Sequence, residues 1–109
     1  MKLADLDVIV TAPPAPGWGG RYWIFVKLTT DTGVVGWGEC YASAVGPEAM
    51  KGVVRDVFER HMAGENPENI EVMFRSAYSS GFTQRPDPTV IGAFAGLEIA
   101  CWDILGKDR

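Results

Sequence analysis

The most restrictive feature of this sequence is its last long run, Thr89–Lys107, in which nearly every residue is apolar or small. The run is too long for a strand, so it predicts a helix of about 28 Å. Pro88 lies just before it, where a helix start tolerates proline. Asp87 or Thr89 can serve as the N-cap, and Gly106 is expected to end the helix.

The apolar residues of this predicted helix extend beyond a single stripe. One face carries Val90, Phe94, Leu97, Cys101, Ile104 and Leu105, and the flanks carry Ile91, Ala95, Ile99 and Trp102. A helix that is apolar nearly all round is usually buried on more than one side, and 109 residues supply few elements to cover it. We therefore expect a partner outside this sequence. Glu98 and Asp103 inside the run argue against a membrane span.

Composition narrows the class of protein. A hydrophobic fraction of 47% in 109 residues indicates one globular domain. The net charge of −4 argues against binding to nucleic acid. The chain does not open with the pattern of a signal peptide, and Cys40 and Cys101 lack metal-ligand spacing. Free buried thiols in a cytoplasmic protein are expected.

Residues before the last run divide into three strands and two helices. Strands are predicted over Lys2–Thr11, Trp23–Thr30 and Val34–Tyr41, the first weakest at Ala4-Asp5. Strands two and three should pair antiparallel across a hairpin loop at 31–33, with the first strand joining them. Gly36 and Gly38 leave room for another backbone or a bulge.

Helical spacing begins at Pro47 and is expected to end at Gly64, and a second helix carries an apolar stripe from Ile70 to Tyr78. The order is three strands followed by three helices. This order predicts an α+β fold in which the helices pack on one face of a three-stranded antiparallel meander.

Two segments resemble the enolase superfamily. AGLEIACWDILGK (95–107) resembles the junction helix of the mandelate racemase and muconate lactonising branch, and DTGVVGWGE (31–39) resembles the second hairpin of galactonate-dehydratase-like members. The resemblance covers nearly the whole chain and stops where a (β/α) barrel should begin. It implies that residues 1–109 are an enolase-like N-terminal capping domain, truncated at the start of the missing barrel.

The resemblance also implies a function. Superfamily enzymes abstract a proton next to a carboxylate, and Mg²⁺ stabilises the product of that step. The parent enzyme is expected to be a Mg²⁺-dependent acid-sugar (aldonate or aldarate) dehydratase that works as a cytoplasmic homo-oligomer on a small-molecule carboxylate. Its catalytic and metal-binding residues would lie in the barrel, so this chain is expected to be inactive alone and to dock on the barrel through its last helix. A racemase or cycloisomerase of the same superfamily is the alternative, and a standalone non-catalytic interaction module is another.

The loop before the second strand carries the first candidate substrate-binding residues, Trp18, Arg21 and Tyr22. From the residues alone, a surface loop with its aromatics folded onto the sheet explains them. The resemblance implies that the loop closes over the barrel mouth. Arg21 would then bind a carboxylate or hydroxyls, and Trp18 or Tyr22 would exclude water.

Glu39 and Tyr41, at the end of the third strand, are the next candidates, since the resemblance places this region near the active site. A structural hydrogen bond or salt bridge is the alternative explanation for Glu39. Arg85, before the last helix, can reach the barrel mouth or remain solvated.

Three further residues receive structural explanations. His61, the only histidine, is interpreted as a charge partner of a helix C-terminus rather than a catalytic base. Asp103 and Lys107 are four residues apart on a helix, which predicts a surface or interdomain ion pair.

Overall fold

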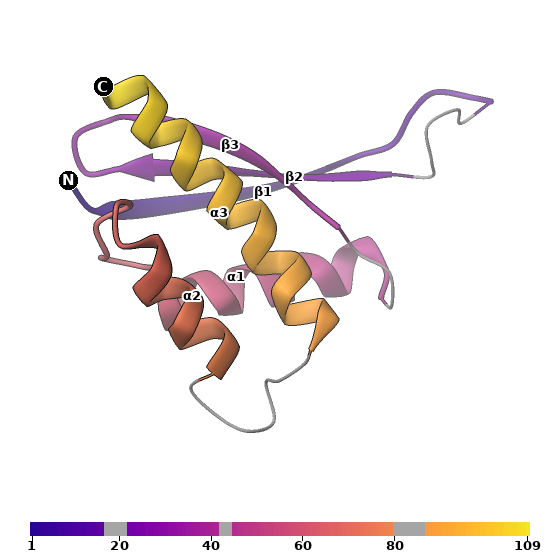
Figure 1. The fold of residues 1–109 in the computed structure, drawn as a ribbon. Helices are drawn as coiled ribbons and strands as arrows, with labels where there is room; N and C mark the ends of the chain where they lie inside the picture. Colours follow the sequence, from indigo (N-terminus) through magenta and orange to yellow (C-terminus); the bar gives the residue numbers. More distant parts are fainter. Residues whose placement is uncertain (17–21, 42–44, 80–86) are drawn as a thin grey trace.

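The computed structural model describes residues 1–16, 22–41, 45–79 and 87–109 (Figure 1). Its elements follow the order β1 (Leu3–Thr11), β2 (Trp23–Thr30), β3 (Val35–Cys40), α1 (Pro47–His61), α2 (Ile70–Ser79) and α3 (Pro88–Asp108). The sheet is an antiparallel meander in the order β1-β2-β3. The predicted α+β fold is therefore confirmed.

The strand register agrees with the sequence pattern. Alternate residues of β2 (Ile24, Val26, Leu28 and Thr30) are buried under the helices, while the residues between them remain partly exposed. The pairing of β1 with β2 shifts between Leu3 and Asp5, in the segment where the first strand was predicted to be weakest. Gly33 turns the second hairpin with a φ of 88°, a left-handed conformation that favours glycine.

The start of α3 follows the prediction, and its end does not. The Asp87 carboxylate caps the helix by accepting hydrogen bonds from the backbone N–H groups of Thr89 (3.0 Å) and Val90 (3.2 Å). The prediction that Gly106 ends the helix was wrong, because α3 continues to Asp108. The last turn is held by side chains of Lys107 and Arg109 that bond to β3 and to Glu68.

One side of α3 packs directly on β3. A Cβ atom placed on Gly38 would overlap the carbonyl oxygen of Gly96, and one on Gly36 would overlap that of Ala100. The two backbones therefore touch at positions where only glycine fits. This confirms the expectation that Gly36 and Gly38 leave room for another backbone.

Another side of α3 is exposed to solvent. Ala95, Ile99 and Trp102 form what we call the outer flank, and Ile99 and Trp102 are 51% and 58% exposed. The helix is long and apolar enough to cross a membrane, but half of its most apolar window is buried inside the domain. Burial against β3 and the other helices thus explains much of its apolar character, and the described part of the chain leaves the outer flank uncovered.

Asp103 and Lys107 fasten α3 to the edge of the sheet. The predicted ion pair is present, with 2.9 Å between Asp103 Oδ2 and Lys107 Nζ. Asp103 Oδ2 also accepts a hydrogen bond from the backbone N–H of Trp37, and Lys107 Nζ donates to the carbonyl of Val35, both at 2.9 Å. We call these contacts the β3 clasp, because they satisfy polar backbone groups on the open edge of β3.

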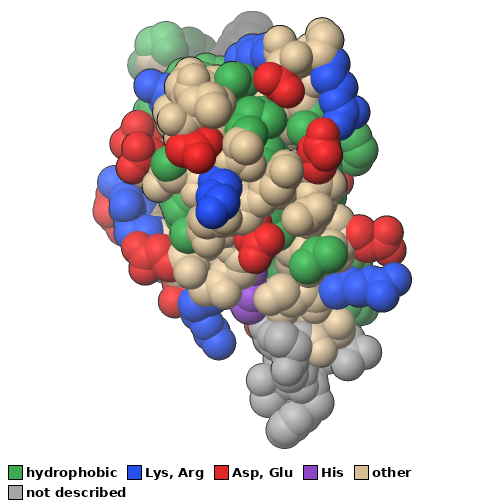
Figure 2. Space-filling model, turned by 90° about the vertical axis from the view of Figure 1, so that its left-hand side faces the viewer, with side chains coloured by type: hydrophobic (Ala, Val, Ile, Leu, Met, Phe, Trp, Pro, Cys, Tyr) green, Lys and Arg blue, Asp and Glu red, His purple; other side chains and the backbone are tan. Residues whose placement is uncertain are grey.

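Charged side chains do not gather by sign on the face seen in Figure 2. Acidic and basic groups are interspersed there with small hydrophobic patches. This mixed pattern is typical of a solvent-facing surface, and it differs from the basic stripe of a nucleic-acid interface.

Candidate functional site

Two connecting segments start from the same end of the sheet. The register pairs Thr11 with Trp23 and Ile24 with Cys40, so the end of β1, the start of β2 and the end of β3 share one edge of the domain. The segments that carry the predicted substrate-binding residues therefore leave the sheet together. We refer to this end as the loop end.

Tyr22 links these two segments. Its half-buried ring packs against the core just before β2, and its hydroxyl donates to the carbonyl oxygen of Val45, 3.4 Å away, in the segment after β3. The tyrosine is therefore held against the domain, and its contact fixes how the start of β2 and the residues before α1 lie together.

A pocket of about 240 Å³ opens at the end of β3, lined by Glu39, Cys40, Tyr41 and Ile99. The Tyr41 side chain is 74% exposed, and Glu39 is exposed as well. Among the described residues, none forms a hydrogen bond or ion pair with the Glu39 carboxylate. The structural explanation for Glu39 thus finds no partner in this part of the chain, and the carboxylate is accessible to a ligand.

The Cys40 thiol in this pocket is unreactive. Burial raises the pKa of Cys40 to about 12, and its Sγ donates to the carbonyl oxygen of Ala93 at 3.5 Å. Burial likewise raises the pKa of Cys101 to about 12. Both cysteines are free and buried, as predicted, and the protonated thiol form makes neither a ready nucleophile.

Three predicted site residues, Trp18, Arg21 and Arg85, lie outside the described residues. Their roles stay predictions. Of the six candidates, the structure brings Tyr22, Glu39 and Tyr41 to the loop end, and it adds Ile99 from α3 as a wall of the same pocket. Sequence analysis placed Ile99 on a flank of the last helix, but gave no sign of which strand it would face.

His61 connects α1 to α2. Its Nδ1 lies 2.7 Å from Ser76 Oγ. Desolvation, and then the neighbouring charge of Arg60, lower the pKa of His61, while Asp56 acts in the opposite direction. The structure thus favours a neutral imidazole that bridges two helices, in place of the charged helix-end partner predicted from the sequence.

A second and larger pocket was missed in the sequence. It has a volume of about 500 Å³ and is lined by Glu68, Ile70, Glu71, Phe74, Glu98 and Trp102. We call it the α2–α3 groove. Ile70 and Phe74 are four apart on α2, as Glu98 and Trp102 are on α3. Only the packing of α2 on α3, marked by the Phe74 and Phe94 rings with centroids 5.8 Å apart, brings the two pairs together.

The described side chains form no cluster that could bind a metal ion. Within residues 1–16, 22–41, 45–79 and 87–109, no three His, Cys, Asp or Glu side chains gather closely enough to hold an ion. The described residues therefore provide no site for the Mg²⁺ that the resemblance places in the barrel, and no step of a reaction is assigned to a metal in this chain.

Comparison with known proteins decides the family. Residues 18–109 match the family described as mandelate racemase / muconate lactonizing enzyme, N-terminal domain. The chain belongs to this family. Its three antiparallel strands followed by three helices are consistent with the enolase N-terminal capping domain.

Individual relatives are much longer than this chain. It is 36% identical over 85 residues to the D-galactonate dehydratase of Cronobacter sakazakii, a match that covers 78% of this chain and 22% of that protein. It is 80% identical to the solved mandelate racemase/muconate lactonizing enzyme-like protein of Roseovarius sp. TM1035, with a TM-score of 0.96. It is 82% identical to the solved mandelate racemase/muconate lactonizing enzyme of Sulfitobacter sp., also with a TM-score of 0.96. In both structural comparisons the match covers 100% of this chain and 28% of the solved chain.

Proposed function

We propose that this chain is the capping and substrate-specificity domain of an acid-sugar dehydratase acting on an aldonate or aldarate. The similarity to a D-galactonate dehydratase supports the reaction class. The loop end supports the role, because Tyr22 ties two connecting segments together beside a pocket whose carboxylate and phenol are open to a ligand. This combination of a fixed frame and accessible polar groups suits selection of a polyhydroxylated substrate.

Each candidate residue would recognise a different group of the substrate. Glu39 accepts hydrogen bonds from sugar hydroxyls, and Tyr41 donates to or accepts from the same kind of group. An anionic carboxylate needs a cation, and Arg21 supplies it by charge-assisted hydrogen bonds. In this proposal Trp18 excludes water, and Arg85 contributes a further cation at the mouth of the barrel.

Proton transfer and metal binding belong to a second domain in this proposal. The described residues offer no metal site and no histidine or thiol poised for catalysis, so a Mg²⁺ ion would be held by the second domain, where it stabilises negative charge next to the substrate carboxylate. The outer flank of α3 docks on that domain, and the complete protein is a cytoplasmic homo-oligomer. On its own the chain is inactive.

A chimeric enzyme tests the function. Residues 1–109 replace the matching segment of the Roseovarius protein, which they resemble over their full length at 80% identity. The purified chimera is assayed with Mg²⁺ against a panel of aldonic and aldaric acids, beside the isolated chain. We expect the chimera to release water from at least one acid sugar and the isolated chain to release none.

Two variants connect the activity to the loop end. Glu39→Gln and Tyr41→Phe should lower kcat/KM by about tenfold or more, with larger losses for substrates whose hydroxyls they contact. Glu59→Gln, an exposed carboxylate on α1, serves as the matched control and should leave kcat/KM unchanged. Turnover by the isolated chain would overturn the capping role. A product with the mass of the substrate would indicate a racemase or cycloisomerase instead.

A further inference from the structure

The α2–α3 groove combines an apolar floor with an acidic rim. Ile70, Phe74 and Trp102 supply the apolar surface, and Glu68, Glu71 and Glu98 supply the carboxylates. Trp102 belongs to both the groove and the outer flank, so the apolar surface continues from one into the other. An exposed indole beside a hollow of about 500 Å³ is typical of a surface that receives a partner.

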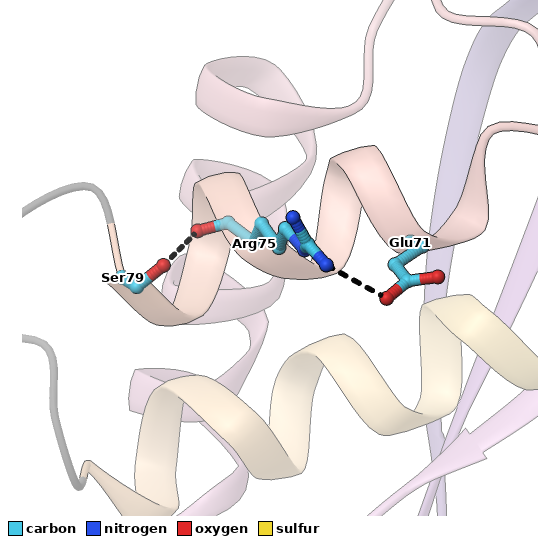
Figure 3. Close-up of polar contacts among 3 residues, drawn as sticks. All are labelled: Glu71, Arg75 and Ser79. Carbon is cyan, nitrogen blue, oxygen red and sulfur yellow. Dashed lines mark hydrogen bonds and ion pairs between the residues drawn. The ribbon is translucent and has the colours of Figure 1, made fainter.

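The three carboxylates of the groove differ in what they bind. Glu71 accepts from the Arg75 guanidinium at 3.2 Å along the same helix, as Figure 3 shows with α3 running beside α2. Glu68 pairs with the guanidinium of Arg109. Glu98 accepts only from the neutral indole N–H of Trp102, at 3.2 Å, and no described cation pairs with it. The groove therefore keeps one carboxylate whose charge is available to a cation from outside.

The position of the chain end points to the occupant. Arg109, the last residue, lies at the groove because it pairs with Glu68 on its rim. The solved relatives continue well beyond the matched segment, which spans 28% of their length. Residues that follow Arg109 in a protein of that length would start beside this groove, and the domain they form would be held near it at high effective concentration.

We propose that the α2–α3 groove binds a segment of the second domain that lays an apolar side chain over Phe74 and Trp102 and places a Lys or Arg on Glu98. The proposal rests on the proposed function, in which this chain is one domain of a larger enzyme. A second copy of this chain fits the groove less well. A symmetric pairing would bring acidic rims of two chains, each of net charge −4, against one another.

Side-chain footprinting with hydroxyl radicals tests the occupant without reference to activity. Labelling of Trp102 and Phe74 is compared between the isolated chain and the chimera that joins residues 1–109 to the remainder of the Roseovarius protein. We expect labelling of Trp102 to fall by about fivefold in the chimera, as for a half-exposed indole that becomes the core of an interface. Val72, which is 61% exposed on α2 and does not line the groove, serves as the internal reference and should change by less than about twofold.

A charge reversal tests the predicted cation. Glu98→Lys in the chimera should restore Trp102 labelling to within about twofold of the isolated chain, because two cations would then face each other. Glu59→Lys carries the same charge change on an exposed position of α1 and should leave Trp102 protected. Circular dichroism melts of both variants show that each remains folded.

Two outcomes would overturn the groove proposal. The first is equal labelling of Trp102 in the chimera and the isolated chain. The second is protection of Trp102 in the isolated chain as concentration rises, which would identify a second copy as the occupant. Failure of the proposed function looks different. If Trp102 is protected in the chimera but the chimera dehydrates no acid sugar, the proposed function is wrong and the groove proposal stands. If the chimera is active but Trp102 stays exposed, the groove proposal is wrong and the proposed function stands.

Discussion

The β3 side of α3 and its outer flank differ in how closely they are packed. On the side against β3 the backbones of Gly96 and Ala100 meet the strand glycines, and Ile104 is fully buried beside Gly36. On the outer flank, Ile99 and Trp102 are half-exposed. Both sides are apolar, so hydrophobicity alone does not separate them.

Residues on the β3 side of α3 therefore contribute to folding, whereas residues on the outer flank are available to a partner. Substitutions on the β3 side act on the stability of this chain, because they disturb a close-packed core. Substitutions on the outer flank leave that core intact and act on whatever covers the flank. The following predictions test this separation, in order of decreasing expected effect.

Thiol reactivity gives the largest expected contrast. Cys101 is fully buried on α3 and Cys40 packs against Gly96, and burial raises the pKa of both thiols to about 12. An alkylating reagent at about pH 8 should modify them at least about a thousandfold more slowly than in denaturant, because reaction requires opening of the core. Mass spectrometry of time points measures both rates. Rapid modification of the native chain would show that the β3 side is not closed.

A methyl group added on the β3 side should strongly lower the stability of the chain. Gly38→Ala places a Cβ against the carbonyl of Gly96 and should lower the free energy of unfolding by about 3 kcal/mol, the upper range for overpacking. Gly52→Ala on α1 meets no atom within 4 Å and should raise it by about 0.5–1 kcal/mol. Urea denaturation of both variants measures the pair. Equal effects would contradict backbone contact between β3 and α3.

The β3 clasp should contribute less, and its contribution should depend on pH. Hydrogen bonds from Lys107, and then from the Trp37 N–H, hold the pKa of Asp103 below its usual value, while partial burial acts in the opposite direction. The Asp103 carboxylate therefore contributes to the free energy of unfolding at pH values above the unfolded pKa of about 3.9. This contribution is lost as pH falls below that value.

Asp103→Asn should therefore lower stability by about 1 kcal/mol at neutral pH. Urea denaturation of wild type and variant at a series of pH values should show the difference shrinking in acid. A difference that persists unchanged well below the ordinary range of aspartate would assign it to packing instead.

Truncation on the outer flank should have the smallest effect. Ile99→Ala should change the free energy of unfolding by less than about 0.5 kcal/mol, because a half-exposed side chain loses little burial. Leu97→Ala, two residues away and fully buried, should cost about 2–5 kcal/mol and serves as the control. Thermal and urea unfolding compare the two. A large loss for Ile99→Ala would mean that the flank belongs to the core of this chain.

Local patterns in the sequence predicted most of the fold. Alternation in β2, glycines in β3, the proline and aspartate before α3, and the separation of Phe94 from Ile99 on the helix all gave correct expectations. The end of α3 was mispredicted because Gly106 is a common stop signal, whereas contacts to β3 and Glu68 extend this helix by two residues.

Contacts between distant segments could not be predicted. Spacing alone revealed the ion pair between Asp103 and Lys107, but the hydrogen bond from Trp37 joins residues 66 apart in sequence. The Tyr22 bond to Val45 and the α2–α3 groove depend likewise on how elements pack. Antiparallel pairing brings Tyr22, Glu39 and Tyr41 to the loop end, but their role in substrate binding stays a prediction.

The glycine contacts between β3 and α3 also fix the position of the helix along the strand. Each close approach matches one position on the strand to one carbonyl on the helix, as Gly38 matches Gly96 and Gly36 matches Ala100. A helix displaced by a single residue would bring bulkier side chains onto the strand, so sliding along it is blocked. The position of α3 along the strand is thereby fixed, and with it the placement of the last turn at Lys107 beside β3.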